Sequence, residues 1–108
     1  FPAQAAEKGI HLLSRLQAAL EGHPHVGDVR GKGLMCAVEI VKDKATKAEF
    51  AAADQIGHKL NLAVQRRGLF TRLRGDVFLI APPVVTPHKL LDRIVEILAA
   101  SIVEVLGP

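Results

Sequence analysis

The strongest constraint on the fold lies in the segment GLFTRLRGDVFLIAPPVVT, residues 68–86. Its apolar run VFLIA, residues 77–81, has the composition of a central, buried β-strand. A Gly-Asp turn precedes the run, so a second short strand at residues 69–71 is predicted to form a hairpin with it. Pro82 and Pro83 follow directly and end the pairing, because proline has no amide hydrogen to donate to a sheet. The chain is therefore predicted to contain a small sheet with residues 77–81 inside it.

A second hairpin is predicted upstream, in HPHVGDVRGKGLMCAVEIVKDK, residues 23–44. Its β-branched residues and glycines indicate a short strand, a tight turn at Gly31-Lys32-Gly33 and a longer strand. Successive side chains of a strand point to opposite faces, so Cys36, Val38 and Ile40 form one apolar face. Residues 35, 37 and 39 form the other face, which carries the charge of Glu39 near its end.

Three amphipathic helices are predicted from apolar residues at steps of three and four. The first spans residues 3–20 and would bury Ala6, Ile10, Leu13, Leu16 and Leu20. The second runs from about residue 50 to 67, with Ala53, Ile56, Leu60, Ala63 and Val64 on its apolar face. The third would start with Thr86 as its N-cap and Pro87 as its first residue, and would bury Leu90, Leu91, Ile94, Leu98 and Ile102.

Together these elements give the order α-β-β-α-β-β-α. Short hairpin connections imply a mainly antiparallel sheet of three or four strands covered by helices, which is an α+β fold. A length of 108 residues suits one domain spanning residues 1–108.

Composition and charge exclude several classes of function. The net charge is only +3, basic and acidic residues are interspersed, and Trp and Tyr are absent, so a nucleic-acid partner is not expected. No apolar run is long enough to span a membrane, and the N-terminus carries neither a signal-peptide pattern nor an initiator Met. We therefore expect a soluble, cytoplasmic protein that is a fragment of a longer one. The single cysteine, Cys36, is expected to be a buried apolar residue.

Side chains suited to metal binding or covalent catalysis are sparse. His23 and His25 flank a proline, but no further ligand cluster occurs at a recognisable spacing, so no metal site is predicted. Lys32, Lys42 and Lys44 lie among charged neighbours near strand ends, where a lysine is a poor Schiff-base nucleophile. The glycines around Lys32 lead into a strand rather than a helix, which argues against a phosphate loop. No catalytic or cofactor-binding residue is predicted.

Arg72 and Arg74 are the side chains whose placement in the sequence does suggest a binding role. Residues two apart in an extended segment share a face, so both guanidinium groups would project from one side near the edge of the sheet. The planar fork of arginine suits a carboxylate, which favours an anion-binding role. The alternative is a pair of surface arginines that form salt bridges to Asp76 or to a helix, and composition alone favours this alternative.

Two motifs resemble a known family. They are V-R-G-K-G-L-M followed by E-I-V-K-D-K-A-T, and R-L-R-G-D followed by an apolar strand and A-P-P. Together they resemble the C-terminal small domain of class III, fold-type I aminotransferases that depend on pyridoxal phosphate (PLP). The pattern is most similar to the omega-amino-acid:pyruvate transaminase branch, and the resemblance covers essentially the whole chain.

The resemblance implies a role for one arginine. In such enzymes the arginine at the position of Arg72 commonly binds the carboxylate of the substrate, whereas Arg74 occupies a variable position. The Schiff-base lysine, the aspartate that pairs with the pyridine nitrogen and the phosphate-binding loop belong to the large domain. The resemblance therefore implies a substrate-recognition and packing domain, inactive by itself, of a homodimeric enzyme that transfers an amino group from an amine or amino acid to a keto acid such as pyruvate.

Two alternative functions, different in kind from an enzyme domain, remain open at this point. The first is a free-standing, non-catalytic α+β binding or interaction module. The second, which is weaker, is a basic nucleic-acid-binding domain.

The first prediction concerns the lysines. Because none is expected in a desolvated or phosphate-adjacent position, PLP followed by borohydride reduction should label the chain sparsely and without selectivity. Peptide mapping by mass spectrometry gives the measurement, and one stoichiometrically labelled lysine would contradict the prediction.

Overall fold

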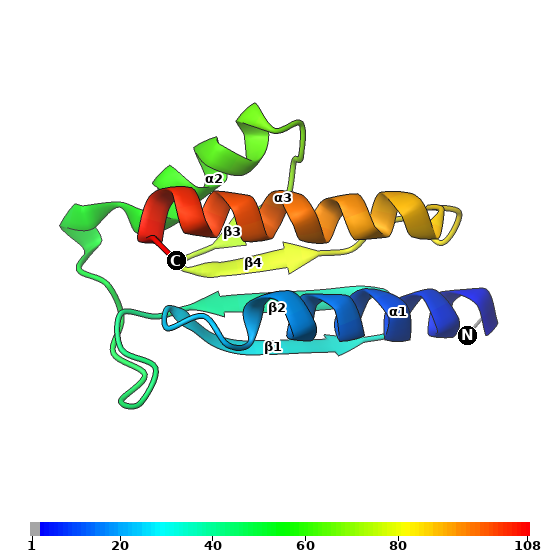
Figure 1. Cartoon of the computed structure of the whole chain (residues 1–108), viewed down its shortest axis with the longest axis horizontal. Coiled ribbons are helices and arrows are strands. Elements are labelled where there is room, and N and C mark those ends of the chain that lie inside the picture. The colour runs from blue at the N-terminus through cyan, green and yellow to red at the C-terminus, as the bar shows by residue number, and fades with distance from the viewer. Residues whose placement is uncertain (1–2) are drawn as a thin grey trace.

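The computed structural model describes residues 3–108 and has two layers (Figure 1). One layer is a four-stranded antiparallel sheet in the order β1-β2-β4-β3. Its strands are β1 (Val26–Lys32), β2 (Met35–Ile40), β3 (Arg72–Arg74) and β4 (Val77–Ile80). The other layer contains α1 (Ala3–Leu20), α2 (Ile56–Arg66) and α3 (His88–Leu106). The predicted α+β class and element order are confirmed.

The core lies between the sheet and the helices. Alternate residues of the two central strands face the helices, and the register places Cys36 opposite Ile80 and Val38 opposite Phe78. These side chains are buried together with the apolar faces of the helices, which include Leu12, Leu16, Leu60, Leu91, Leu98 and Ile102. The alternation predicted for residues 35–40 is therefore confirmed, because the apolar face of β2 is the one that packs into the core.

The buried face of α1 differs from the predicted one by a rotation of one residue. The structure buries Ala5, Gly9, Leu12, Leu16 and Leu20. Ile10 is instead 68% exposed. The cause is the contact of Gly9 with the β1–β2 turn, where a methyl group added to Gly9 would lie 1.9 Å from the carbonyl oxygen of Gly33. Only a residue without a side chain allows this approach, so the glycine turns toward the sheet and Ile10 turns away.

Several element boundaries also differ from the predictions. The turn between β1 and β2 lies at Gly33, whose φ of 58° is left-handed. The second helix starts at Ile56 rather than near residue 50, because Gln55 has a left-handed φ of 52° and separates it from the short 3-10 helix Ala52–Asp54. The strand predicted at residues 69–71 lies at Arg72–Arg74 instead. Thr86 does not cap α3, because Pro87 occupies the N-cap position without a side-chain hydrogen bond.

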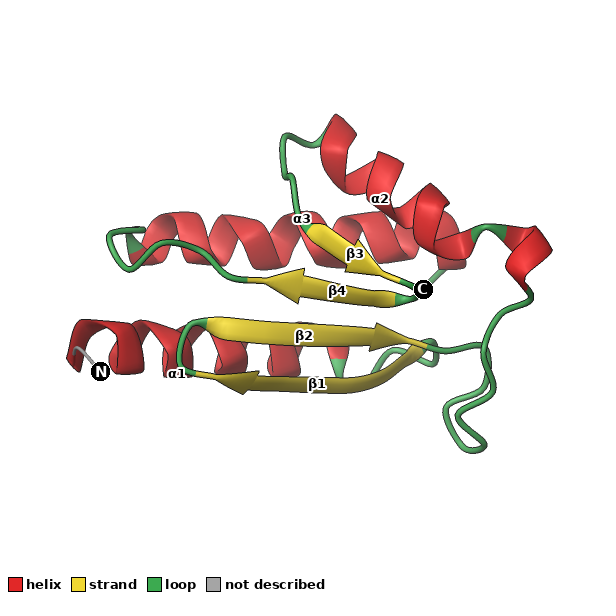
Figure 2. Ribbon diagram, turned by 180° about the vertical axis from the view of Figure 1, so that it is seen from behind, coloured by secondary structure: helices red, strands yellow, loops and turns green. Residues whose placement is uncertain are grey.

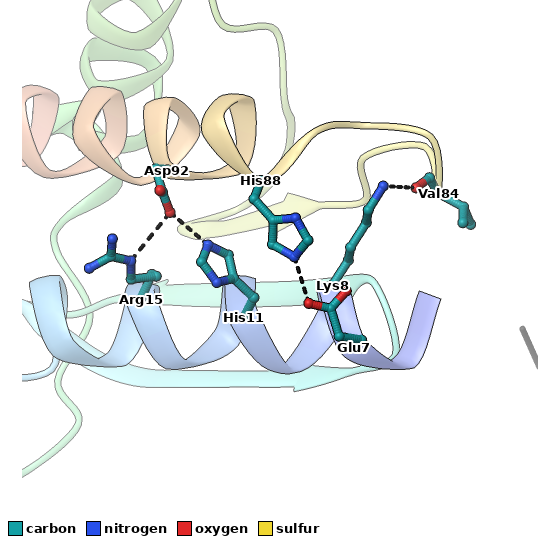
Figure 3. A network of polar contacts seen from close by, with 7 residues as sticks. All are labelled: Glu7, Lys8, His11, Arg15, Val84, His88 and Asp92. Atoms are coloured by element: carbon teal, nitrogen blue, oxygen red, sulfur yellow. Dashed lines mark hydrogen bonds and ion pairs between the residues drawn. The ribbon is translucent and has the colours of Figure 1, made fainter. Parts of the chain in front are cut away.

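A polar network joins α1 to α3 and to the segment that follows β4 (Figure 3). Asp92 accepts hydrogen bonds from His11 Nε2 at 2.7 Å and from Arg15 Nε at 3.3 Å. Glu7 contacts His88 Nε2 at 2.6 Å, and the Lys8 ammonium donates to the carbonyl oxygen of Val84 at 2.7 Å. The hydrogen bonds from His11 and Arg15 hold the pKa of the Asp92 carboxyl below its usual value. The network thus joins α1 to the first two turns of α3, and Lys8 ties Val84 of the preceding segment to α1.

Gly9→Ala is expected to destabilise the domain by about 1 to 3 kcal/mol, because the added methyl group collides with the Gly33 backbone. The effect opposes the gain of about 1 kcal/mol that alanine normally gives a helix. Urea unfolding gives the measurement. Gly22→Ala is the control, since a methyl group there meets no atom within 4 Å. Equal stability of the two variants would contradict the proposed contact.

The Asp92 carboxylate predicts a loss of stability in acid. Its folded pKa is lowered, so its contribution is present above the unfolded pKa of about 3.9 and is lost as the pH falls through the lower folded value. Asp92→Asn should therefore lower the thermal midpoint at neutral pH, and the difference from the wild type should shrink below about pH 4. Asp54→Asn is the control, because the Asp54 carboxylate is exposed and forms no side-chain hydrogen bond with the described residues. A difference independent of pH would contradict this assignment.

Candidate functional site

One face of the sheet carries no helix. Figure 2 views the molecule from this side, with the strands in front of α1 and α3. The register places Arg72 beside Leu79 and Arg74 beside Val77, and Leu79 in turn lies beside Ala37 of β2. These residues alternate with the core residues Phe78 and Ile80, so they project from the helix-free face. The two arginines therefore share this face, as the sequence predicted, and they lie on the edge strand β3.

The guanidinium groups of Arg72 and Arg74 are exposed. Within residues 3–108, neither group forms a hydrogen bond or an ion pair with another side chain or with the backbone. Other arginines of the domain do have partners: Arg30 contacts Asp28 at 3.1 Å and Glu39 at 3.2 Å on the same side of the sheet. Two positive charges on β3 thus remain uncompensated.

Asp76 was the alternative partner for the two arginines. Its carboxyl group does not contact either of them. Partial burial, with a smaller contribution from the charge of Glu49, raises the pKa of the Asp76 carboxyl. A contact with an arginine would lower the pKa of this carboxyl group, so the raised pKa agrees with the absence of such a contact. The salt bridge to Asp76, which was one alternative explanation for Arg72 and Arg74, is therefore not present in the structure.

Arg72 lines a groove between β3, the segment after β4 and α3, with a volume of about 530 Å³. We call it the edge groove. Arg93 of α3 also lines it, and Phe70, at its rim, is 78% exposed. The hydroxyl oxygen of Thr71 lies buried in its wall without a hydrogen-bond partner among the described residues. Arg93 pairs with Glu96 at 3.5 Å, so the groove combines the unpaired guanidinium group of Arg72 with apolar walls, which suits an anion that has an apolar part.

A second groove adjoins the first and is almost entirely apolar. We call it the apolar groove; it has a volume of about 740 Å³ and lies between the N-terminal half of α1 and the β1–β2 turn. Its walls include Ile10 and Leu13, and Lys32 is its one charged lining residue. The two grooves share three lining residues, Met35, Ala81 and Pro82.

The site contains groups that bind, but no groups suited to bond making. The described residues include no group of three side chains that could hold a metal ion. Burial raises the pKa of the Cys36 thiol, so it is not a reactive thiolate. Lys8, Lys44 and Lys47 donate to backbone carbonyl oxygens of Val84, Glu21 and Gly27. Recognition of an anion is therefore the chemistry that these residues support.

Sequence reasoning did not identify three residues of these grooves, Arg93, Phe70 and Met35. Arg93 has no motif around it, and its place is determined only when α3 packs beside the edge strand. Met35 was assigned to the face of β2 opposite the core, but the sequence does not show that this end of the strand meets α1 and Pro82.

In the described part of the chain, none of the helices has both the length and the apolar character needed to cross a bilayer.

Comparison with protein families gives a match to the model of the family described as aminotransferase class-III, over residues 1–102. An uncharacterized aminotransferase of Schizosaccharomyces pombe is 37% identical over 107 residues, which cover 92% of this chain and 23% of that protein. An adenosylmethionine-8-amino-7-oxononanoate aminotransferase of Nitratidesulfovibrio vulgaris is 35% identical over 96 residues, which cover 89% of this chain and 18% of that protein.

Solved structures show the same relationship. An (S)-enantioselective omega-transaminase from Thermomicrobium roseum superposes with a TM-score of 0.91 and 43% identity, covering 95% of this chain and 23% of that chain. A thermostable mutant omega transaminase from Pseudomonas jessenii superposes with a TM-score of 0.89 and 35% identity, covering 97% of this chain and 24% of that chain. The chain therefore spans only about a quarter or less of the length of the proteins that it matches.

Proposed function

Because the chain belongs to the class III aminotransferases, we propose that it is the substrate-recognition and packing domain of a longer PLP-dependent enzyme. That enzyme would transfer an amino group between an amine or amino acid and a keto acid such as pyruvate. The likeness to omega-transaminase structures supports this substrate class, and the coverage of about 23% of their length supports a partial domain. The partners in this proposal are the large PLP-binding domain of the same polypeptide and a second subunit of a cytoplasmic homodimer.

Arg72 is the residue that we assign to the substrate carboxylate. The observation that carries this assignment is its uncompensated guanidinium group on the helix-free face, at the wall of the edge groove. Its backbone pairs with β4, whose Phe78 is fully buried, so the base of the side chain is held in place. A guanidinium fork on a rigid strand can form two parallel hydrogen bonds to a carboxylate. Arg74 lies on the same face but does not line the groove.

The described residues do not fit the PLP cofactor itself. A Schiff-base lysine needs a desolvated position beside a phosphate site. Six of the seven lysines are exposed: Lys32, Lys42, Lys44, Lys47, Lys59 and Lys89. The remaining one, Lys8, is half-buried but donates to the carbonyl oxygen of Val84. We therefore propose that the cofactor, which supplies the electron-sink chemistry, is held by other parts of the enzyme, and that this domain alone is inactive.

The carboxylate assignment predicts a substrate-dependent effect of Arg72→Ala in the full-length enzyme. The variant loses a charge-assisted hydrogen bond of about 1.5 to 3 kcal/mol, so kcat/KM for alanine or pyruvate should fall about 10- to 150-fold. Amine donors without a carboxylate do not use this contact, and their half-reaction should change little. The measurement is kcat/KM for matched donors with and without a carboxylate.

Two further variants act as controls. Arg72→Lys should recover only part of the activity, because an ammonium group keeps the charge but not the two-pronged geometry. Arg74→Ala should be nearly silent. Equal losses for both kinds of donor, or a larger effect at Arg74, would show that the carboxylate is bound elsewhere. The intact mass of the natural protein separates this proposal from a free-standing binding module, which would have no large domain.

A further inference from the structure

The strand that carries Arg72 has a neighbouring strand on one side only. Within the described sheet, β3 is an edge strand that pairs with β4, so no strand fixes its outer side. Figures 1 and 2 both show α2 at this margin of the sheet. The position of Arg72 therefore depends on what holds β3 besides its pairing with β4.

The side chain between the two arginines faces the helices. Arg72 and Arg74 project from the helix-free face, so Leu73 projects from the opposite face, where it packs against the core. Its partner in the register is the buried Phe78. Leu73 also reaches the first turn of α2, because a methyl group added to Gly57 would lie 3.1 Å from Leu73 Cδ2. Leu73 thus anchors β3 on α2 from the side opposite the arginines.

The first turn of α2 also meets the turn between β3 and β4. The same added methyl group would lie 2.8 Å from the carbonyl oxygen of Gly75 and 3.1 Å from Asp76 Oδ1. The first of these distances is shorter than van der Waals contact, and a backbone oxygen cannot swing aside as the end of a side chain can. The absence of a side chain at Gly57 therefore allows α2 to lie this close to the hairpin.

The helix on which the hairpin rests is itself fixed. The apolar face of α2 is buried through Leu60, Ala63 and Val64. Directly after the helix, Arg67 Nη1 donates to Glu104 Oε1 of α3 at 2.7 Å. An added group at the first turn of α2 would therefore displace the hairpin more readily than the helix.

We propose that Gly57 is a positioning residue for Arg72. Its close contact with Leu73 and with the Gly75 carbonyl oxygen sets the distance between α2 and β3, and so the place of the Arg72 guanidinium group at the wall of the edge groove. Gly57 does not line that groove and acts only through β3. This inference rests on the carboxylate role of Arg72 proposed above.

Amide hydrogen exchange in the 108-residue chain tests the contact without a substrate. Gly57→Ala should accelerate exchange in the β3–β4 hairpin, residues 72–80, about tenfold more than in the β1–β2 hairpin, residues 26–40, because the collision loosens the first of these locally. Gly9→Ala is the matched control. It places the same methyl group against the β1–β2 turn, and it should accelerate exchange mainly in residues 26–40.

A second variant covers the case in which Gly57→Ala does not fold. Leu73→Ala removes the anchor of β3 without causing a collision, and it should give the same exchange pattern as Gly57→Ala. Equal acceleration of the two hairpins by the variants at positions 57 and 73 would overturn the proposal.

In the full-length enzyme the effect on activity should pass through Arg72. Gly57→Ala should raise KM for alanine or pyruvate about three- to tenfold with little change in kcat, because it displaces a group that binds the carboxylate. Donors without a carboxylate should be almost unaffected. In an Arg72→Ala background the same substitution should have no further effect, because the displaced group is already absent. Gly9→Ala should not distinguish the two kinds of donor.

Two kinetic results would contradict the positioning role. One is losses that add in the Gly57→Ala, Arg72→Ala double variant. The other is equal losses for both donor types in Gly57→Ala when Arg72→Ala does distinguish them. Failure of the proposed function appears differently, as equal losses for both donor types in Arg72→Ala, and the exchange pattern tests the positioning of β3 in that case too.

Discussion

The pairing of β2 with β4 is the interaction on which the rest of the fold depends. These strands lie far apart in the sequence, and their register joins the two hairpins into one sheet. It places Val38 against Phe78, both fully buried, under the helices. An additional backbone hydrogen bond of 2.9 Å runs from the Ile40 amide to the Asp76 carbonyl oxygen. Without this pairing β3 would have no partner fixed to the core, and the position of Arg72 would not be defined.

The element types and their order could be predicted because periodicity is a local property of the sequence. The period of two in residues 35–40 and the helical spacing around Leu16 and Leu98 remain after folding. The face of α1 could not be predicted, because the close approach of Gly9 to Gly33 is a tertiary contact. The structure also starts α2 later than the sequence predicted, because nothing in the local pattern shows that Gln55 takes a left-handed conformation. Local signals therefore determine elements, and long-range packing determines their rotation and ends.

In the candidate site, too, local sequence signals identify some features and long-range packing determines the others. Arg72 was singled out from its motif and its spacing to Arg74, and the structure adds that both side chains lack partners among the described residues. The edge groove was not foreseeable, because its walls come from β3, α3 and the segment after β4. Arg93 joins this groove only through helix packing. A sequence motif can thus identify a charged residue, whereas the shape of the cavity around it requires the fold.

The shortness and charge of the outer strands have a further consequence. An edge strand with free backbone groups can recruit a strand from another molecule, and proteins limit this with short edges, charged residues and bulges. The edge strand β3 has three residues, two of which are arginines. The opposite edge, β1, carries Asp28, Arg30 and Lys32 and has an irregular register between Val26 and Asp28. The charges on both outer strands thus disfavour the addition of a fifth strand from another molecule, because each new strand would bring a charged edge against a charged edge.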